Sequence, residues 1–199
     1  MGINIKARNE GKRSTQRKVL IVCEGAKTEP TYFQSFRVAK QVCDVRGIGA
    51  NTVSLVRHAH TLSLQDEYRE VWCVFDRDSF TKQNVTSALA LAERFGFKCA
   101  FSNESFELWY VLHFCYLDTQ ISRHDYCVRL GHFLKFPYVK NDHRMYGFLK
   151  SMQPIAIKNA KKLEKVMCKP GVALVDARPS TSVYRLVERL NALEKKLGR

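Results

Sequence analysis

Short apolar runs alternate with amphipathic stretches through the first 118 residues. Apolar or β-branched runs at 18–23, 52–56, 71–75 and 97–101 predict four strands. Apolar side chains recur at helical spacing between them, most clearly over 81–95, which a glycine follows. Strands that alternate with helices favour an α/β fold with right-handed crossovers. We therefore expect a Rossmann-like core with a mainly parallel sheet of about four strands, flanked by helices.

The pattern changes beyond residue 118, where helical spacing predominates. Helices are predicted at roughly 122–136, 142–151, 154–168 and 181–196, separated by proline-containing breaks. The stretch 171–175 could add one edge strand, and Ser180 and Thr181 are candidates for the cap of the last helix. The predicted organisation is a flexible basic arm (1–17), an α/β catalytic core (18–118) and a basic helical portion packed on that core (119–199).

Charge is unevenly distributed over these three parts. Residues 1–18 carry six basic and one acidic side chain, a net +5. Residues 19–119 carry ten basic and twelve acidic side chains, a net −2, and residues 120–199 carry seventeen and six, a net +11, within a total of +14. A basic portion beside a nearly neutral core is the expected electrostatic footprint of a nucleic-acid partner. A solvated basic face that only aids solubility is the alternative.

Cellular location and redox state follow from what the sequence lacks. No apolar run approaches the roughly 20 residues of a membrane helix, and the N-terminus has no signal-peptide core. The seven cysteines are an odd number without a CxxC pair, which favours reduced thiols over a disulfide scaffold or a zinc site. We expect a soluble cytoplasmic protein with no membrane partner.

Three acidic residues follow two of the predicted strands. Glu24 follows the strand at 18–23, and Asp76 and Asp78 follow the strand at 71–75. Carboxyl ends of parallel strands meet at one edge of a sheet, and residues i and i+2 of an extended chain point to the same side. Such carboxylates could bind one hard divalent cation. Glu24 could instead act as a general base, and solvated loop acids remain the simpler alternative.

A fourth acid lies in an apolar helical stretch. Glu107 is surrounded in sequence by Phe, Leu, Trp, Tyr and Val, where a charge is costly unless it is paired or bound to a metal ion. Glu104 precedes it by three residues and could be a further ligand or could favour the N-terminus of the helix. In the predicted metal site, Asp76 and Asp78 hold the ion, Glu24 binds it or activates water, and Glu107 completes the cluster or binds a second ion.

Candidate substrate-binding residues are basic or lie at a predicted helix start. Lys27 lies in the turn after the first strand, which could cradle a phosphate although it is no GxxxxGK[ST] loop. The C-terminal portion interleaves lysines with aromatic residues, a combination that can hold phosphates and stack unpaired bases. The predicted substrate-binding set is Lys27, Lys140, Lys158, Lys161, Lys162 and Thr181, with a solvated helix face as the alternative for the lysines.

The acidic motifs resemble the Toprim pattern, and their surroundings resemble the RloB family in particular. The resemblance covers about residues 18–190 and rests on the order and spacing of several short motifs. These are VLIVCEGAKTEPTYF at 19–33, VWCVFDRD at 71–78, Ser102-Asn103 with FELW at 106–109 and LHF at 112–114, Tyr138-x-Lys140 with Tyr146, and PSTSV at 179–183. Two departures are Glu104-Ser105, where the family pattern has Pro and a small residue, and Arg178, where it has Asn.

The resemblance implies a Toprim-type fold, bound Mg²⁺ or Mn²⁺, and nuclease activity in prokaryotic anti-phage defence. RNA, and tRNA in particular, is the substrate class that it suggests, and a homodimer or an association with a partner defence protein stays open. We therefore predict a metal-dependent endonuclease, more specifically an endoribonuclease. A nucleic-acid-binding or regulatory module without cleavage is the main alternative. A phosphoryl-receiver domain, which needs an acidic pair after strand one, and ribonuclease-type Toprim maturases are less favoured.

Overall fold

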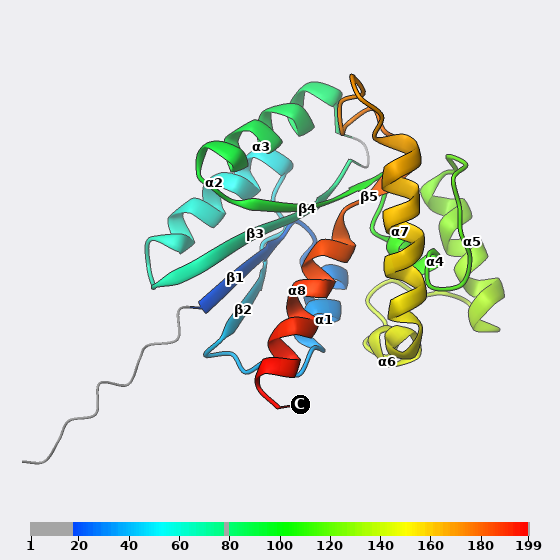
Figure 1. Cartoon of the computed structure of the whole chain (residues 1–199), viewed down its shortest axis with the longest axis horizontal. Coiled ribbons are helices and arrows are strands. Elements are labelled where there is room, and N and C mark those ends of the chain that lie inside the picture. Colours follow the sequence, from blue (N-terminus) through cyan, green and yellow to red (C-terminus); the bar gives the residue numbers. More distant parts are fainter. Residues whose placement is uncertain (1–17, 78–79, 199) are drawn as a thin grey trace, which may run out of the picture.

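The computed structural model describes residues 18–77 and 80–198 (Figure 1). The predicted basic arm (1–17) and the predicted ligand Asp78 lie outside the described residues. A five-stranded sheet has the order β2-β1-β3-β4-β5. Its strands are β1 (Lys18–Cys23), β2 (Cys43–Gly47), β3 (Tyr68–Asp76), β4 (Lys98–Asn103) and β5 (Ser180–Thr181). The first four are parallel and β5 pairs antiparallel with β4, so the prediction of an α/β fold with a mainly parallel sheet is confirmed.

Helices cover both faces of the sheet. They are α1 (Thr28–Gln34), α2 (Thr52–Ser63), α3 (Lys82–Arg94), α4 (Glu107–Val111), α5 (Arg123–Leu134), α6 (Met145–Leu149), η1 (Lys150–Met152), α7 (Gln153–Met167) and α8 (Val183–Lys196). Helices α1 and α8 lie on one face, and α2 and α3 lie on the other (Figure 1). Helices α4, α5 and α7 lie beyond the end of the sheet at which β1 ends (Figure 1).

The central strand β1 is apolar because both of its faces are covered. Val19 and Ile21 pack with α1 and α8 in one core, whereas Leu20 and Val22 pack with α2 and α3 in the other. A parallel strand that is buried on both sides requires a continuous apolar run rather than alternation. The first core also includes side chains of α4, α5 and α7, so the C-terminal portion packs directly on the α/β core.

The predicted strand at 52–56 is wrong, because these residues begin helix α2. The side chain of Asn51 caps this helix by accepting a hydrogen bond from the backbone N–H of Ser54 at 3.1 Å. Leu55, Val56 and Ala59 are fully buried at helical spacing. The second strand is instead β2, an edge strand in a stretch for which the sequence pattern predicts no strand. It carries charged side chains and pairs only with β1, so it lacks the apolar run that marks a buried strand.

The edge of the sheet also differs from the prediction. The additional strand is Ser180–Thr181 rather than 171–175, and helix α8 begins after Ser182. The N-cap position is thus Ser182, but the Thr181 hydroxyl still accepts a hydrogen bond from the backbone N–H of Val183, the first residue of α8, at 3.3 Å. Thr181 pairs with Ser102 of β4 through both backbone and side chain, and the two hydroxyl oxygens are 3.0 Å apart. The apolar helical stretch that contains Glu107 forms only the short helix α4, Glu107–Val111.

The other predicted helices have counterparts in the structure. Helices α5 and α7 match the predicted ranges 122–136 and 154–168 to within two residues at each end. Within 18–77 and 80–198, no helix combines the length and apolar character needed to cross a membrane.

His113 follows α4 and is a buried histidine of this core. It is 1% exposed, and its Nδ1 donates a hydrogen bond to the Trp109 carbonyl at 2.9 Å. Burial lowers the pKa of His113 to about 4. Below pH 6.5 the unfolded chain binds a proton here that the folded protein does not bind until about pH 4, so this residue makes stability fall as the pH falls.

We predict that H113Q flattens the dependence of stability on pH. Between pH 7 and pH 5 the wild type should lose about 2 kcal/mol of unfolding free energy more than H113Q does. Urea denaturation at several pH values measures this difference. H143Q, which changes an exposed histidine, is the matched control. Parallel stability curves for the wild type and H113Q would contradict the prediction.

Candidate active site

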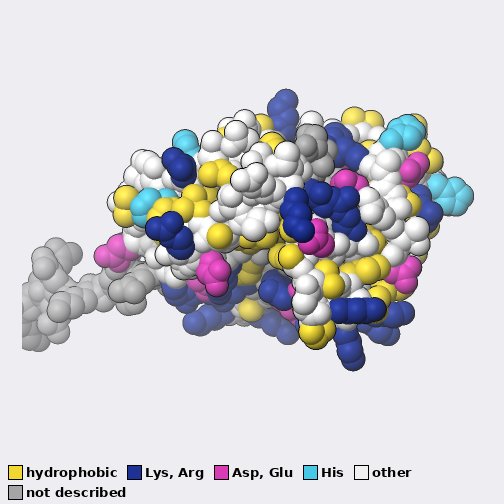
Figure 2. All heavy atoms as spheres, turned by 90° about the horizontal axis from the view of Figure 1, so that it is seen from above, with side chains coloured by type: hydrophobic (Ala, Val, Ile, Leu, Met, Phe, Trp, Pro, Cys, Tyr) yellow, Lys and Arg dark blue, Asp and Glu magenta, His cyan; other side chains and the backbone are white. Residues whose placement is uncertain are grey.

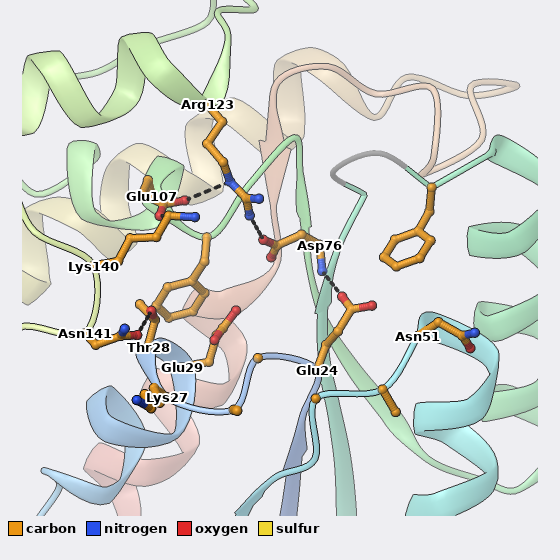
Figure 3. A pocket seen from close by; sticks show the side chains of 16 residues that line it. Glu24, Lys27, Thr28, Glu29, Asn51, Asp76, Glu107, Arg123, Lys140 and Asn141 are labelled. Carbon is orange, nitrogen blue, oxygen red and sulfur yellow. Dashed lines mark hydrogen bonds and ion pairs between the residues drawn. The ribbon is translucent and has the colours of Figure 1, made fainter.

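A crevice opens where the strand order reverses. The chain leaves β1 through α1 to β2 on one side, whereas β3 pairs with β1 on the other side. Ligands of open α/β sheets bind at such a switch point, beyond the carboxyl ends of the strands. Glu24 follows β1 here, and Asp76 is the last residue of β3. Both line a cavity of about 650 Å³ (Figure 3).

The cavity is lined by side chains of both charges. Its acidic side chains are those of Glu24, Glu29, Asp76 and Glu107, and its basic side chains are those of Lys27, Arg123 and Lys140. They come from the ends of β1 and β3, from α1 with the turn before it, from the first residues of α4 and α5, and from the loop before α6 (Figure 3). In the face shown in Figure 2, Lys and Arg side chains gather around an acidic side chain.

Glu24 and Asp76, two of the predicted acids, meet at the end of β3. The backbone N–H of Asp76 donates a hydrogen bond to Glu24 Oε2 at 3.3 Å. Asp76 is 4% exposed, and its carboxylate accepts a hydrogen bond from Arg123 Nη2 at 3.0 Å. The strand-end argument thus places Glu24 and Asp76 correctly beside each other.

Glu107 reaches the same cavity from the N-terminus of α4. Glu107 is only 2% exposed, and ion pairs join its carboxylate to two cations. Arg123 Nε lies 3.7 Å from one of its carboxylate oxygens, and Lys140 Nζ lies 3.9 Å from the other. An acid inside an apolar helix therefore has the charged partners that its burial requires.

Glu29 is a further acid of this cavity that the sequence reasoning missed. It lies in the first turn of α1 and is 8% exposed. A signal was present, because Tyr32, Phe33 and Phe36 follow it at the spacing of one helical face and are all buried. Its carboxylate lies against Gly25, where a Cβ atom would be only 2.0 Å from Glu29 Oε2. Glycine at this position leaves room for the carboxylate.

Burial and mutual repulsion disfavour the charged forms of Asp76 and Glu29. Burial raises the pKa of Asp76 well above its usual range, and the negative charge of Glu29 raises it further, against the opposing effect of Arg123. Burial also raises the pKa of Glu29, with a further contribution from Glu107. Such a cluster favours the binding of cations.

The cationic residues of the cavity come from different segments of the chain. Lys27 lies in the turn before α1, and Lys140 lies in the loop that connects α5 to α6. Thr28 donates a hydrogen bond from its hydroxyl to Asn141 Oδ1 at 2.7 Å, which joins the start of α1 to that loop. Arg123 had not been predicted, because only the packing of α5 brings it to the acids.

The remaining predicted substrate-binding residues do not line this cavity. Lys158, Lys161 and Lys162 are exposed on α7. Lys161 forms an ion pair with Glu188 at 2.6 Å, and Lys162 lies 4.0 Å from the ring centroid of Tyr116. Thr181 is buried in β5.

The chemistry of the acidic residues suits a hard divalent cation. Their donors are carboxylate oxygens, which Mg²⁺ and Mn²⁺ prefer. Asp76 Oδ1 and Glu107 Oε2 are buried and accept no hydrogen bond within the part of the chain that the structure describes. Over residues 18–77 and 80–198, however, no three His, Cys, Asp or Glu side chains are grouped closely enough to hold a metal ion.

Fold and cavity together define an α/β protein with an acidic, cation-lined site at the switch point of a mainly parallel sheet. The chain belongs to the RloB-like family, whose model, described as RloB-like protein, matches residues 19–190. The family suggested by the sequence motifs is thereby confirmed. Neither a curated protein nor a solved structure matches the chain.

The contact between Gly25 and Glu29 predicts an energetic coupling between these two positions. G25A should lower the unfolding free energy by about 1 kcal/mol, because the new methyl group displaces the Glu29 carboxylate. In an E29A background the same substitution should cost much less, which gives a coupling energy of about 1 kcal/mol. Urea denaturation of the four proteins measures this cycle.

Gly47 provides the matched control for this cycle. A Cβ atom there would lie 2.6 Å from Pro30 Cγ and 2.8 Å from the carbonyl oxygen of Gly25, neither of which E29A removes. G47A should therefore remain destabilising in both backgrounds. Additive effects of G25A and E29A would show that the glycine is not required by the carboxylate.

Proposed function

We propose that this protein is a metal-dependent nuclease that hydrolyses phosphodiester bonds. The observation that carries the proposal is the convergence of four acidic side chains, three of them buried, on one cavity at the switch point of the sheet. Clusters of this kind bind divalent cations in enzymes of phosphodiester hydrolysis. Basic side chains line the same cavity, where they can hold the substrate's phosphate groups.

Each group has a separate role in this proposal. Asp76 and Glu107 hold Mg²⁺ or Mn²⁺, and Asp78 adds a ligand as the motif predicts. Glu24 is a ligand or accepts a proton from the attacking water. A bound divalent cation would activate water and neutralise charge on the phosphate. Lys27 and Lys140 hold the nucleic-acid backbone.

RNA is the favoured substrate class. This preference rests on the resemblance to the RloB family, which implies nuclease activity toward RNA such as tRNA in prokaryotic anti-phage defence, in the cytoplasm. Contacts with phosphates alone do not distinguish RNA from DNA, since the 2′-hydroxyl carries that difference. The experiment below therefore offers both nucleic acids.

A second candidate function is nucleic-acid binding without cleavage. The specific observation in its favour is that Arg123 and Lys140 already pair with the acids of the cavity. A binding module would show affinity that falls steeply with salt and no turnover with any divalent metal ion. The cleavage experiment separates the two candidates.

We predict cleavage that requires both a divalent metal ion and the buried acids. The protein is incubated with total RNA and with plasmid DNA, in Mn²⁺, Mg²⁺ or chelator, and the product ends are mapped. D76N and E107Q should each reduce the rate by about 100-fold or more, because each removes a metal ligand. D118N changes an exposed acid outside the cavity and should retain activity. Undiminished cleavage by a folded D76N protein would contradict the proposal.

We also predict that Lys27 and Lys140 contribute to binding through phosphate contacts. K27Q and K140Q should each weaken RNA binding and reduce the slope of log affinity against log salt by about one. Fluorescence anisotropy over a salt series measures this slope. K196Q, at the far end of α8, is the control and should leave it unchanged. An unaltered slope in K27Q and K140Q would show that other residues contact the phosphate backbone of the RNA.

A further inference from the structure

Arg123 bridges the two most deeply buried acids of the cavity. Its guanidinium donates to Asp76 at 3.0 Å and forms an ion pair with Glu107 at 3.7 Å (Figure 3). These two carboxylates come from different elements, the end of β3 and the start of α4. One cationic group therefore contacts both of the acids that the proposed function assigns to the metal ion.

The position of Arg123 in its own helix does not account for its charge. It is the first residue of α5, where the helix dipole disfavours a cation. The start of the helix is fixed by a capping box in which Ser122 and Asp125 each accept a hydrogen bond from the other's backbone N–H, both at 3.2 Å. The backbone at residue 123 is thus held in place, and the long side chain reaches the acids.

The Arg123 side chain is not enclosed by these contacts. About a third of it (33%) is exposed, whereas the Asp76 and Glu107 side chains are 6% and 3% exposed. Arg123 also lines the open cavity, so a ligand bound there lies near the guanidinium. A guanidinium also suits a phosphate group, which it can bind through two parallel hydrogen bonds.

We propose that Arg123 is the counter-ion of the acids in the metal-free protein and that it exchanges partners when a divalent cation binds. The cation takes the carboxylates of Asp76 and Glu107, and Arg123 then contacts a substrate phosphate. This inference rests on the proposed function, since it assigns the metal ion and the nucleic acid to this cavity. It makes Arg123 a residue that competes with the metal and binds the substrate.

Lys140 has a different place in this scheme. Its ammonium lies 3.9 Å from Glu107 alone, and 48% of the side chain is exposed. Lys27 lines the cavity but forms no ion pair with an acid of the cavity within 18–77 and 80–198. K27Q therefore serves as a matched control that removes one positive charge from the cavity without removing a counter-ion.

The first measurement is the affinity of the metal-free full chain for Mn²⁺, by electron paramagnetic resonance. R123Q should bind Mn²⁺ about tenfold more tightly than the wild type, because the ion no longer displaces a guanidinium. K27Q should change the affinity much less. Equal Mn²⁺ affinities of the wild type and R123Q would overturn the exchange.

The second measurement is the affinity for a labelled single-stranded RNA, with Ca²⁺ in place of Mn²⁺ and in chelator. R123Q should weaken binding by about tenfold in Ca²⁺ and only slightly in chelator, where Arg123 of the wild type stays on the acids. Weakening of the same size in both conditions would overturn the exchange.

Two further outcomes separate the exchange from the proposed function. If R123Q binds Mn²⁺ more tightly but the wild type cleaves no nucleic acid, the nuclease proposal fails and the exchange stands. If neither protein binds Mn²⁺, both fail. Should R123Q not fold, R123K keeps the charge but cannot bridge two carboxylates as a planar guanidinium does, and its Mn²⁺ affinity should exceed that of the wild type. An R123K affinity at or below the wild-type value would overturn the exchange.

Discussion

The burial of several carboxylates in one cavity is the constraint on which the arrangement of the chain depends. Asp76, Glu107 and Glu29 are each less than a tenth exposed, and buried acids of like charge destabilise a fold unless cations accompany them. Arg123 and Lys140, two cations that pair with these acids, belong to the C-terminal portion. The buried acids therefore depend on that portion for charge balance, and the α/β core depends on it for the apolar surface that it covers.

Sheet topology explains why the acids meet at this place. Because β1 and β3 are neighbours, while β2 lies on the other side of β1, the connections that follow them diverge and leave a crevice. The turn after β1 brings Glu24 to the backbone of Asp76, and the short helix α1 turns Glu29 inward toward Gly25. Strand β5 and helix α8 then return to the sheet, so the inserted helices α5 to α7 stay attached to the core at both ends.

Local patterns predicted the elements whose burial is continuous or periodic. The apolar runs of β1 and β3 and the helical spacing of α3, α5 and α7 were sufficient to predict these elements. β2 was missed because its edge position permits Asp44 and Arg46, and α2 was mistaken for a strand because its first turn is rich in β-branched residues. The positions of Glu24 and Asp76 in the site could be predicted because both lie at strand ends. Arg123 lies at the start of a helix far along the chain, so no local pattern could predict that it reaches the same site.

The net charge of the C-terminal portion includes cations whose charge is balanced within the protein. Several of its cations are paired within the protein: Arg123 and Lys140 with acids of the cavity, Lys161 with Glu188, Arg185 with Glu164 and Arg189 with Glu70. Glu70, Asp76 and Glu107 belong to the core, so part of the basic excess neutralises acids of the core. A metal ion that took Asp76 and Glu107 would return this positive charge to the cavity, where phosphate groups of a nucleic acid could use it. In the metal-free protein, then, Arg123 and Lys140 balance the buried acids of the cavity, and under the exchange proposed above their charge would become available to a substrate as those acids gain another cation.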